Sequence, residues 1–259
     1  MMGYFYFDES IQERGGFIVG AYVYGPDADV EVTTALERVG LRPGVDEFKS
    51  SARMSAHPEQ VALRAELKRL LVNFRVGVLV TPNDDRATLG AEALRCLDQI
   101  ARANELAKGE RLMAFFDQGV FGSPGQAAAL SGSIGLNQYC DVKAEQDSRA
   151  VKGLQLADLV AHTAGIMLLE TLGLVRKQVK AGPHSGYEPD MELDLGFEMW
   201  ASIRYQFFHA GPVEQQEDVY QGALMEVGVN GLYVSQACSP ALRAGALARF
   251  GRCYLGCIH

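Results

Sequence analysis

The sequence is poor in cysteine and has no long apolar run. Its five cysteines are an odd number spread over 259 residues, which does not match the dense disulfide framework of a small secreted protein. No basic segment followed by an apolar stretch opens the chain. The most apolar stretch, residues 154–172, contains Asp158, His162 and Glu170, which a membrane-spanning helix would tolerate poorly. We therefore expect a cytoplasmic protein that does not associate with membranes.

Basic residues are also scarce. The chain has 24 Lys and Arg residues against 32 Asp and Glu, a net charge of −8. A protein that coats nucleic acid without sequence preference depends on dense Lys and Arg, so this class is disfavoured. The charge is uneven, because residues 170–220 hold nine acids and four bases and so supply −5 of the total. The remainder is close to balanced and leaves room for a local basic groove.

Hydrophobic patterning predicts an α/β fold. Apolar runs typical of strands occupy residues 4–7, 17–24, 76–80, 112–116 and 139–144. Helical patterns lie between or after them, near residues 31–39, 58–71, 84–101, 126–130 and 154–172. We expect a mixed five-stranded sheet with helices on both faces, formed by residues 1–172. Residues 173–259 are expected to form a C-terminal appendage with helices near 200–208 and 241–250.

Three acids occupy positions that folding alone does not favour. Asp8 and Asp117 each follow a predicted buried strand, and Asp158 lies in an otherwise apolar helix. Taken singly, each has a simpler explanation, such as capping a turn or pairing with a base or with His162. If the two strands are parallel neighbours, their ends meet at one edge of the sheet. Converging carboxylates repel one another unless a cation neutralises them, so we expect all three acids to bind Mg²⁺ or Mn²⁺.

Short motifs follow one another along the chain. They are residues 6–10 (YFDES), 47–49 (EFK), Asp117, 147–149 (DSR) and 153–160 (GLQLADLV). In this order they resemble the bacterial family known as domain of unknown function 3800, whose sheet is of the ribonuclease H-like type. The resemblance covers roughly residues 4–170 and implies a metal-dependent, nuclease-like site.

The fourth acid of that site has two candidates. In ribonuclease H-like enzymes a glutamate on the first helix after the antiparallel strands often joins the metal ligands, which here would be Glu92. The family motif instead points to Glu47 in the preceding loop. We therefore expect the catalytic residues to be Asp8, Glu47, Asp117 and Asp158.

Residues beside these motifs are expected to hold the substrate or to orient the acids. The bases expected to contact phosphate are Lys49, Arg149 and Lys152. Ser10 is expected to bond the turn backbone, and Ser148 to cap the Asp158 helix or orient its ligands. His162 shares a helical face with Asp158, as a structural residue or a supporting one. Glu9 should point to the opposite face of its strand from the preceding acid.

The leading hypothesis is hydrolysis of phosphodiester bonds in nucleic acid by two metal ions. Asp8 would bridge the two ions, about 3.5–4 Å apart, while Asp117 and Asp158 each complete one site. The sequence does not distinguish DNA from RNA, and a homo-oligomer is compatible with it. One alternative is an aspartyl-nucleophile phosphatase, although Ser10 stands where that class has a second Asp. Another is a catalytically inactive nuclease-fold protein that binds a partner in a defence or mobile-element system.

Overall fold

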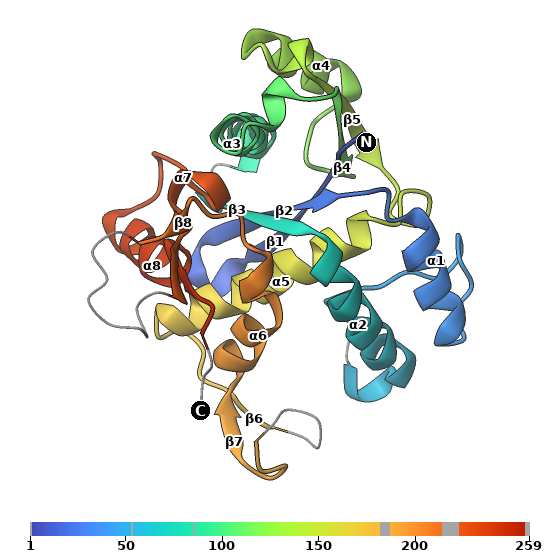
Figure 1. The fold of residues 1–259 in the computed structure, drawn as a ribbon, viewed down its shortest axis with the longest axis vertical. Coiled ribbons are helices and arrows are strands. Elements are labelled where there is room, and N and C mark those ends of the chain that lie inside the picture. Colours follow the sequence, from blue (N-terminus) through green and yellow to red (C-terminus); the bar gives the residue numbers. More distant parts are fainter. Residues whose placement is uncertain (1, 53, 85, 182–186, 214–222, 257–259) are drawn as a thin grey trace.

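A six-stranded mixed sheet forms the centre of the protein (Figure 1). The computed structural model describes residues 2–52, 54–84, 86–181, 187–213 and 223–256. The strand order is β10-β3-β2-β1-β4-β5. The strands are β1 (Tyr4–Gln12), β2 (Phe17–Gly25), β3 (Arg75–Pro82), β4 (Leu112–Asp117), β5 (Cys140–Gln146) and β10 (Leu232–Val234).

The first three strands form an antiparallel meander, and β4 and β5 continue the sheet in parallel with β1. This arrangement confirms the predicted mixed sheet, and the order β3-β2-β1-β4-β5 is consistent with a ribonuclease H-like fold. The sixth strand was not predicted. It comes from the C-terminal region, where β10 pairs in parallel with β3 and covers an edge that would otherwise expose unpaired backbone groups.

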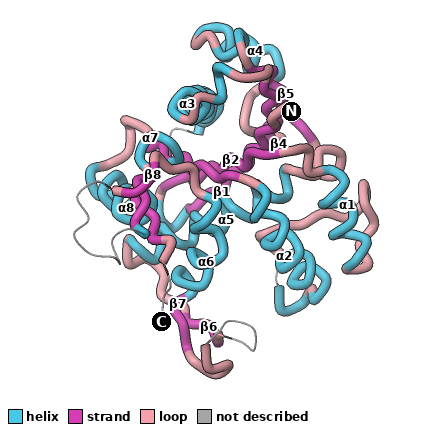
Figure 2. The backbone as a smooth tube through the Cα atoms, in the orientation of Figure 1, coloured by secondary structure: helices cyan, strands magenta, loops and turns pink. Residues whose placement is uncertain are grey.

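Helices cover both faces of the sheet, as predicted (Figure 2). On one face α5 (Leu154–Thr171) packs along β1 and β2. The other helices that join this core are α1 (Asp29–Arg38), α2 (Pro58–Leu70), α6 (Leu195–Ile203) and α8 (Pro240–Phe250). The opposite face carries α3 (Leu89–Ala103) and α4 (Pro124–Ser133). None of the described helices is both long enough and apolar enough to cross a membrane.

Side chains of β1 alternate between two buried cores. Tyr6 packs in the core beneath α5, whereas Phe5 and Phe7 pack in the core beneath α3, and all three are almost completely buried. Successive residues of a strand point to opposite faces of the sheet. The side chain of Asp8 therefore points toward α5, on the same face as Tyr6, and that of Glu9 points toward α3, on the same face as Phe7. The alternation of side chains along the strand thus places Asp8 and Glu9 on opposite faces of the sheet.

Several element boundaries differ from those predicted. β1 continues to Gln12, so Asp8 lies within the strand and pairs with Ala21 of β2. The polar residues that follow it carry no apolar pattern, and antiparallel pairing keeps them extended. The helix expected from residue 84 begins at Leu89, after a 3-10 turn over residues 86–88.

The C-terminal region also departs from the expected pattern. The helix expected at 200–208 begins earlier, at Leu195, and ends in a 3-10 turn over residues 204–206. A hairpin of β6 (Gln178–Lys180) and β7 (Glu192–Asp194), which was not predicted, precedes α6. The helix expected at 241–250 is α8, which packs against α5. A small sheet of β8 (Gly211–Pro212), β9 (Leu224–Glu226) and β11 (Arg252–Tyr254) and the short helix α7 (Gly228–Gly231) complete the region.

Candidate active site

Three acids, Asp8, Asp117 and Asp158, lie on the α5 face of the sheet, and Glu47 lies nearby. We call these four residues the acidic edge. Phe7 of β1 pairs in parallel with Phe116 of β4, so Asp8 and Asp117 come directly after paired residues of neighbouring strands. Asp117 lies two residues after Phe115, which packs against the core beneath α5, just as Asp8 lies two residues after Tyr6. Asp158 stands on α5, which packs along β1. Sheet topology therefore brings the predicted acids into one region.

The electrostatics of these carboxylates show that they lie within each other's field. Burial raises the pKa of Asp8 well above its ordinary value, and the negative charges of Asp158 and Asp117 raise it further. Burial also raises the pKa of Asp117, and Asp158 adds to this effect. The pKa of Asp158 is raised by burial although its hydrogen bonds with Ser50 oppose the shift. In the ionised state these groups are buried charges that repel one another.

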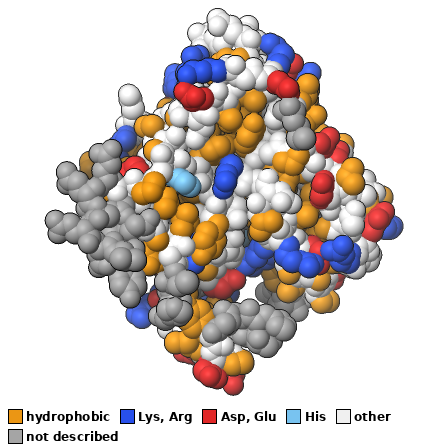
Figure 3. All heavy atoms as spheres, in the orientation of Figure 1, with side chains coloured by type: hydrophobic (Ala, Val, Ile, Leu, Met, Phe, Trp, Pro, Cys, Tyr) orange, Lys and Arg blue, Asp and Glu red, His pale blue; other side chains and the backbone are white. Residues whose placement is uncertain are grey.

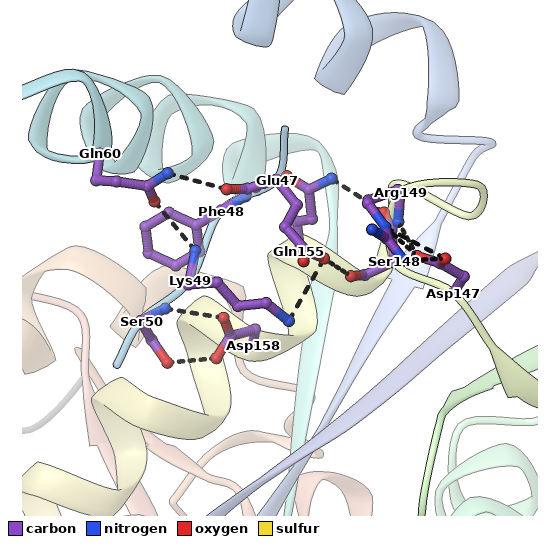
Figure 4. Close-up of polar contacts among 10 residues, drawn as sticks. All are labelled: Glu47, Phe48, Lys49, Ser50, Gln60, Asp147, Ser148, Arg149, Gln155 and Asp158. Carbon is purple, nitrogen blue, oxygen red and sulfur yellow. Dashed lines mark hydrogen bonds and ion pairs between the residues drawn. The ribbon is translucent and has the colours of Figure 1, made fainter. Parts of the chain in front are cut away.

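Lys49 supplies positive charge to the acidic edge. Its ammonium group points toward Glu47, with Nζ 3.4 Å from Oε2 (Figure 4). Partial burial opposes its protonation, but the carboxylates of Glu47, Asp117 and Asp158 raise the pKa of Lys49 above its ordinary value. The residue predicted to hold phosphate thus acts as an internal counter-charge in this arrangement.

Ser50 occupies both oxygens of Asp158. Its backbone N–H donates to Oδ2 at 3.0 Å, and its hydroxyl donates to Oδ1 (Figure 4). Within the described part of the chain, no three Asp, Glu, His or Cys side chains lie close enough to hold one metal ion. The donor set of carboxylate oxygens suits Mg²⁺ or Mn²⁺. A metal held by all three aspartates would require these side chains to shift, and would share Asp158 with Ser50.

Two glutamines fix the loop that carries Glu47 and Lys49. The completely buried Gln155 of α5 accepts the N–H of Phe48 at 2.8 Å and donates to the carbonyl of Ser148 at 3.0 Å. Gln60 of α2 bonds the backbone on either side of Phe48. Neither glutamine was predicted to have this role. The signal was present for Gln155, because an amide in an apolar helix must find hydrogen-bond partners.

Three residues predicted to support the acids have different environments. The hydroxyl of Ser148 donates to Glu47, so it orients that carboxylate. The alternative that it caps α5 is wrong, because Gly153 is the N-cap and no side chain bonds it. The hydrogen bond expected from Ser10 to turn backbone is not found among the described contacts. Ser10 lies in β1, and its hydroxyl accepts a hydrogen bond from the side-chain amide of Gln12 at 2.8 Å.

His162 lies one helical turn after Asp158 on α5. Burial lowers its pKa, and the charge of Asp158 opposes that shift. The two side chains are therefore electrostatic neighbours, as their spacing on one helical face predicts.

The two remaining predicted phosphate contacts lie in the turn before α5. The guanidinium of Arg149 forms an ion pair with Asp147 at 2.7 Å. The backbone N–H of Lys152 donates to Asp29 at 3.0 Å, which ties this turn to α1. Lys49 is thus the base of the predicted set that contacts a carboxylate of the acidic edge.

Glu9 lies on the other face of β1 from Asp8. Burial, followed by the charge of Asp117, raises the pKa of Glu9 to about 7, while Arg86 opposes the shift. Its Oε2 atom is buried and has no hydrogen-bond partner among the described residues. The sequence predicted that Glu9 faces away from Asp8, but the burial of its carboxylate was not predicted, because it depends on elements that are distant in the chain.

A scan of the chain against protein-family models found no match, and a search of curated proteins also found none. The resemblance to the domain of unknown function 3800 therefore rests on the short motifs alone. Function has to follow from the side chains of the acidic edge.

Proposed function

We propose that the protein is a metal-dependent nuclease that hydrolyses phosphodiester bonds of nucleic acid at the acidic edge. The main support is the position of Asp8 and Asp117 on paired strands with Asp158 on the helix that packs along β1, close enough for their charges to raise the pKa of Asp8 beyond the effect of burial. Such a cluster is unfavourable when empty and is stabilised by a divalent cation. The motif resemblance to a ribonuclease H-like family agrees with this function.

Asp8, Asp117 and Asp158 would hold Mg²⁺ or Mn²⁺. When bound, the metal lowers the pKa of a water molecule and neutralises charge on the phosphate. Glu47 would orient water or accept its proton, and its contacts with Ser148 and Lys49, which hold its carboxylate, support this role. Lys49 offsets part of the negative charge of the acids before substrate binds. On binding, its ammonium group would leave Glu47 and contact a phosphate oxygen of the substrate.

The second candidate is a catalytically inactive nuclease-fold protein that binds a partner. The observation that favours it is the engagement of both Asp158 oxygens by Ser50. On the face drawn in Figure 3, basic side chains occur as separate small groups among acidic and apolar ones. This pattern agrees with the net charge of −8 and offers a weak surface for unspecific binding of nucleic acid.

The deciding experiment is a cleavage assay. Labelled single-stranded DNA, duplex DNA, RNA and a hybrid are incubated with Mg²⁺ or Mn²⁺ and the wild type, Asp8→Asn or Asp158→Asn. We expect metal-dependent cleavage of at least one substrate, and a loss of at least about 100-fold in either variant. Asp190→Asn is the matched control, since this acid has 88% of its side chain exposed and lies in the distant hairpin loop.

The outcomes separate the candidates. Cleavage that survives Asp8→Asn places the activity elsewhere and overturns the proposal. Absence of both cleavage and Mn²⁺ binding by calorimetry points to the inactive binding protein. Capture of a covalent phosphoenzyme on Asp8 points to the aspartyl-nucleophile phosphatase.

A further inference from the structure

A cavity of about 570 Å³ adjoins the acidic edge at Ser50. Ser50, which donates both of its hydrogen bonds to Asp158, also lines this cavity. The walls come from the loop after Phe48 and from α2, α5, β6 and α6. Its volume lies within the range of about 300–1,000 Å³ that is typical of small-ligand sites.

The lining of the cavity is mainly apolar. Its apolar lining includes Phe48, Met54, Leu159, Ile166, Leu195 and Met199. Phe48, Leu159 and Met199 are almost completely buried in the core beneath them, so this part of the wall is fixed before any ligand arrives. A preformed apolar wall favours a flat apolar group and costs little ordering entropy on binding.

The polar groups of the cavity are mostly basic. Arg64, His162 and Lys177 line it, and no Asp or Glu is among the described residues that do. Arg64 makes no ion pair and no hydrogen bond with the described residues, whereas Arg69, the other arginine of α2, forms an ion pair with Glu66. The positive charge of Arg64 also lowers the pKa of His162, in addition to the effect of burial, which places the two side chains near each other. A protein of net charge −8 thus keeps the positive charge of Arg64 without an ion pair beside the acidic edge.

This combination selects a ligand with a flat apolar body and an anionic group. We propose that the cavity binds one nucleotide unit, with the base against the apolar wall and a phosphate on Arg64. This inference rests on the proposed nuclease function. The phosphodiester bond next to the bound nucleotide would then lie at Asp158, so the cavity would select the nucleotide beside the bond that is cleaved. Inorganic phosphate would leave the apolar wall exposed to water, and a nucleoside would leave Arg64 unpaired.

The test uses full-length protein in EDTA, so that binding is measured without metal or cleavage. Calorimetry compares adenosine monophosphate with its two parts, adenosine and inorganic phosphate. We expect the monophosphate to bind more tightly than either part, and Arg64→Gln to weaken it at least about tenfold, as expected for loss of a charge-assisted hydrogen bond. Arg69→Gln removes the same charge from an exposed position on the same helix and should bind like the wild type.

A second variant probes the apolar wall independently of charge. Val179→Trp fills the cavity from the outer hairpin, away from the buried core, and should weaken binding of both adenosine monophosphate and adenosine. Failure of the monophosphate to bind would overturn the proposal. Equal binding by Arg64→Gln and Arg69→Gln, or phosphate binding as tight as that of the monophosphate, would overturn it as well.

The same measurements separate this proposal from the nuclease proposal. Asp8→Asn should lose cleavage and retain binding of the monophosphate, because Asp8 does not line the cavity. Cleavage by a wild type that does not bind the monophosphate would refute the nucleotide cavity alone. Binding that depends on Arg64 without any metal-dependent cleavage would support the cavity and refute the nuclease.

Discussion

Replacing Glu9 by glutamine should stabilise the metal-free protein at neutral and higher pH. The Oε2 atom of Glu9 is buried without a hydrogen-bond partner among the described residues. Burial, followed by the charge of Asp117, raises its pKa from 4.5 to about 7. Since one pKa unit corresponds to about 1.4 kcal/mol, ionised Glu9 lowers the free energy of unfolding by up to about 3 kcal/mol. Solvent screening reduces this figure, so we expect about 1–3 kcal/mol.

The sign of the pH dependence follows from the direction of the shift. The pKa of Glu9 is higher in the folded state than in the unfolded state, so the folded state binds the proton more tightly. The resulting stabilisation is fully present below about pH 4.5 and is lost as the pH rises through about 7. Glutamine does not titrate, so the advantage of Glu9→Gln should grow between about pH 5 and about pH 8 and then level off.

Urea unfolding in EDTA, followed by circular dichroism at several pH values, measures this difference. Glu37→Gln makes the same replacement at an exposed position on α1 and reports the effect of the amide itself. If the difference in free energy of unfolding between Glu9→Gln and wild type stays constant from about pH 5 to about pH 8, the pKa of Glu9 is not raised by folding and the reasoning is refuted.

Two further predictions concern the packing that holds the site. Gln155→Leu should lower the free energy of unfolding by about 2–4 kcal/mol in urea titrations, because two buried backbone groups lose their partner; a loss below about 1 kcal/mol would contradict this role. Gly153→Ala should cost about 1–3 kcal/mol, because its Cβ would overlap the ring of Tyr6. Gly125→Ala on α4, where the added Cβ would be 3.8 Å from the nearest atom, Ser123 Oγ, should be neutral or stabilising in the same assay.

Apolar runs predicted the central strands well, because buried strands must be apolar and the pattern is local. The end of β1 could not be predicted in the same way. Three of its four residues after Asp8 are polar, and this segment is extended because β2 pairs with it along its whole length. The sixth strand, β10, has three residues and depends on a free edge of β3, which the local sequence does not describe.

The candidate site was predictable to a similar extent. Asp117 ends an apolar strand, and Asp158 interrupts an apolar helix, so both were visible as exceptions to a pattern. The hydrogen bonds of Ser50 with Asp158 join residues 108 positions apart, and the bond of Ser148 with Glu47 spans 101. Such contacts arise from packing of the loop on α5, and no spacing in the chain encodes them.

The sequence by itself determined the α/β class, the five N-terminal strands and the identity of the acids, because burial and side-chain periodicity act over a few residues. Tertiary structure decided that Ser50 bonds Asp158, that Lys49 offsets part of the negative charge of the acids, and that a basic apolar cavity adjoins Asp158. These features depend on charges and surfaces from distant segments meeting in space. Their energies are set by separation and burial, which exist only once the chain has folded.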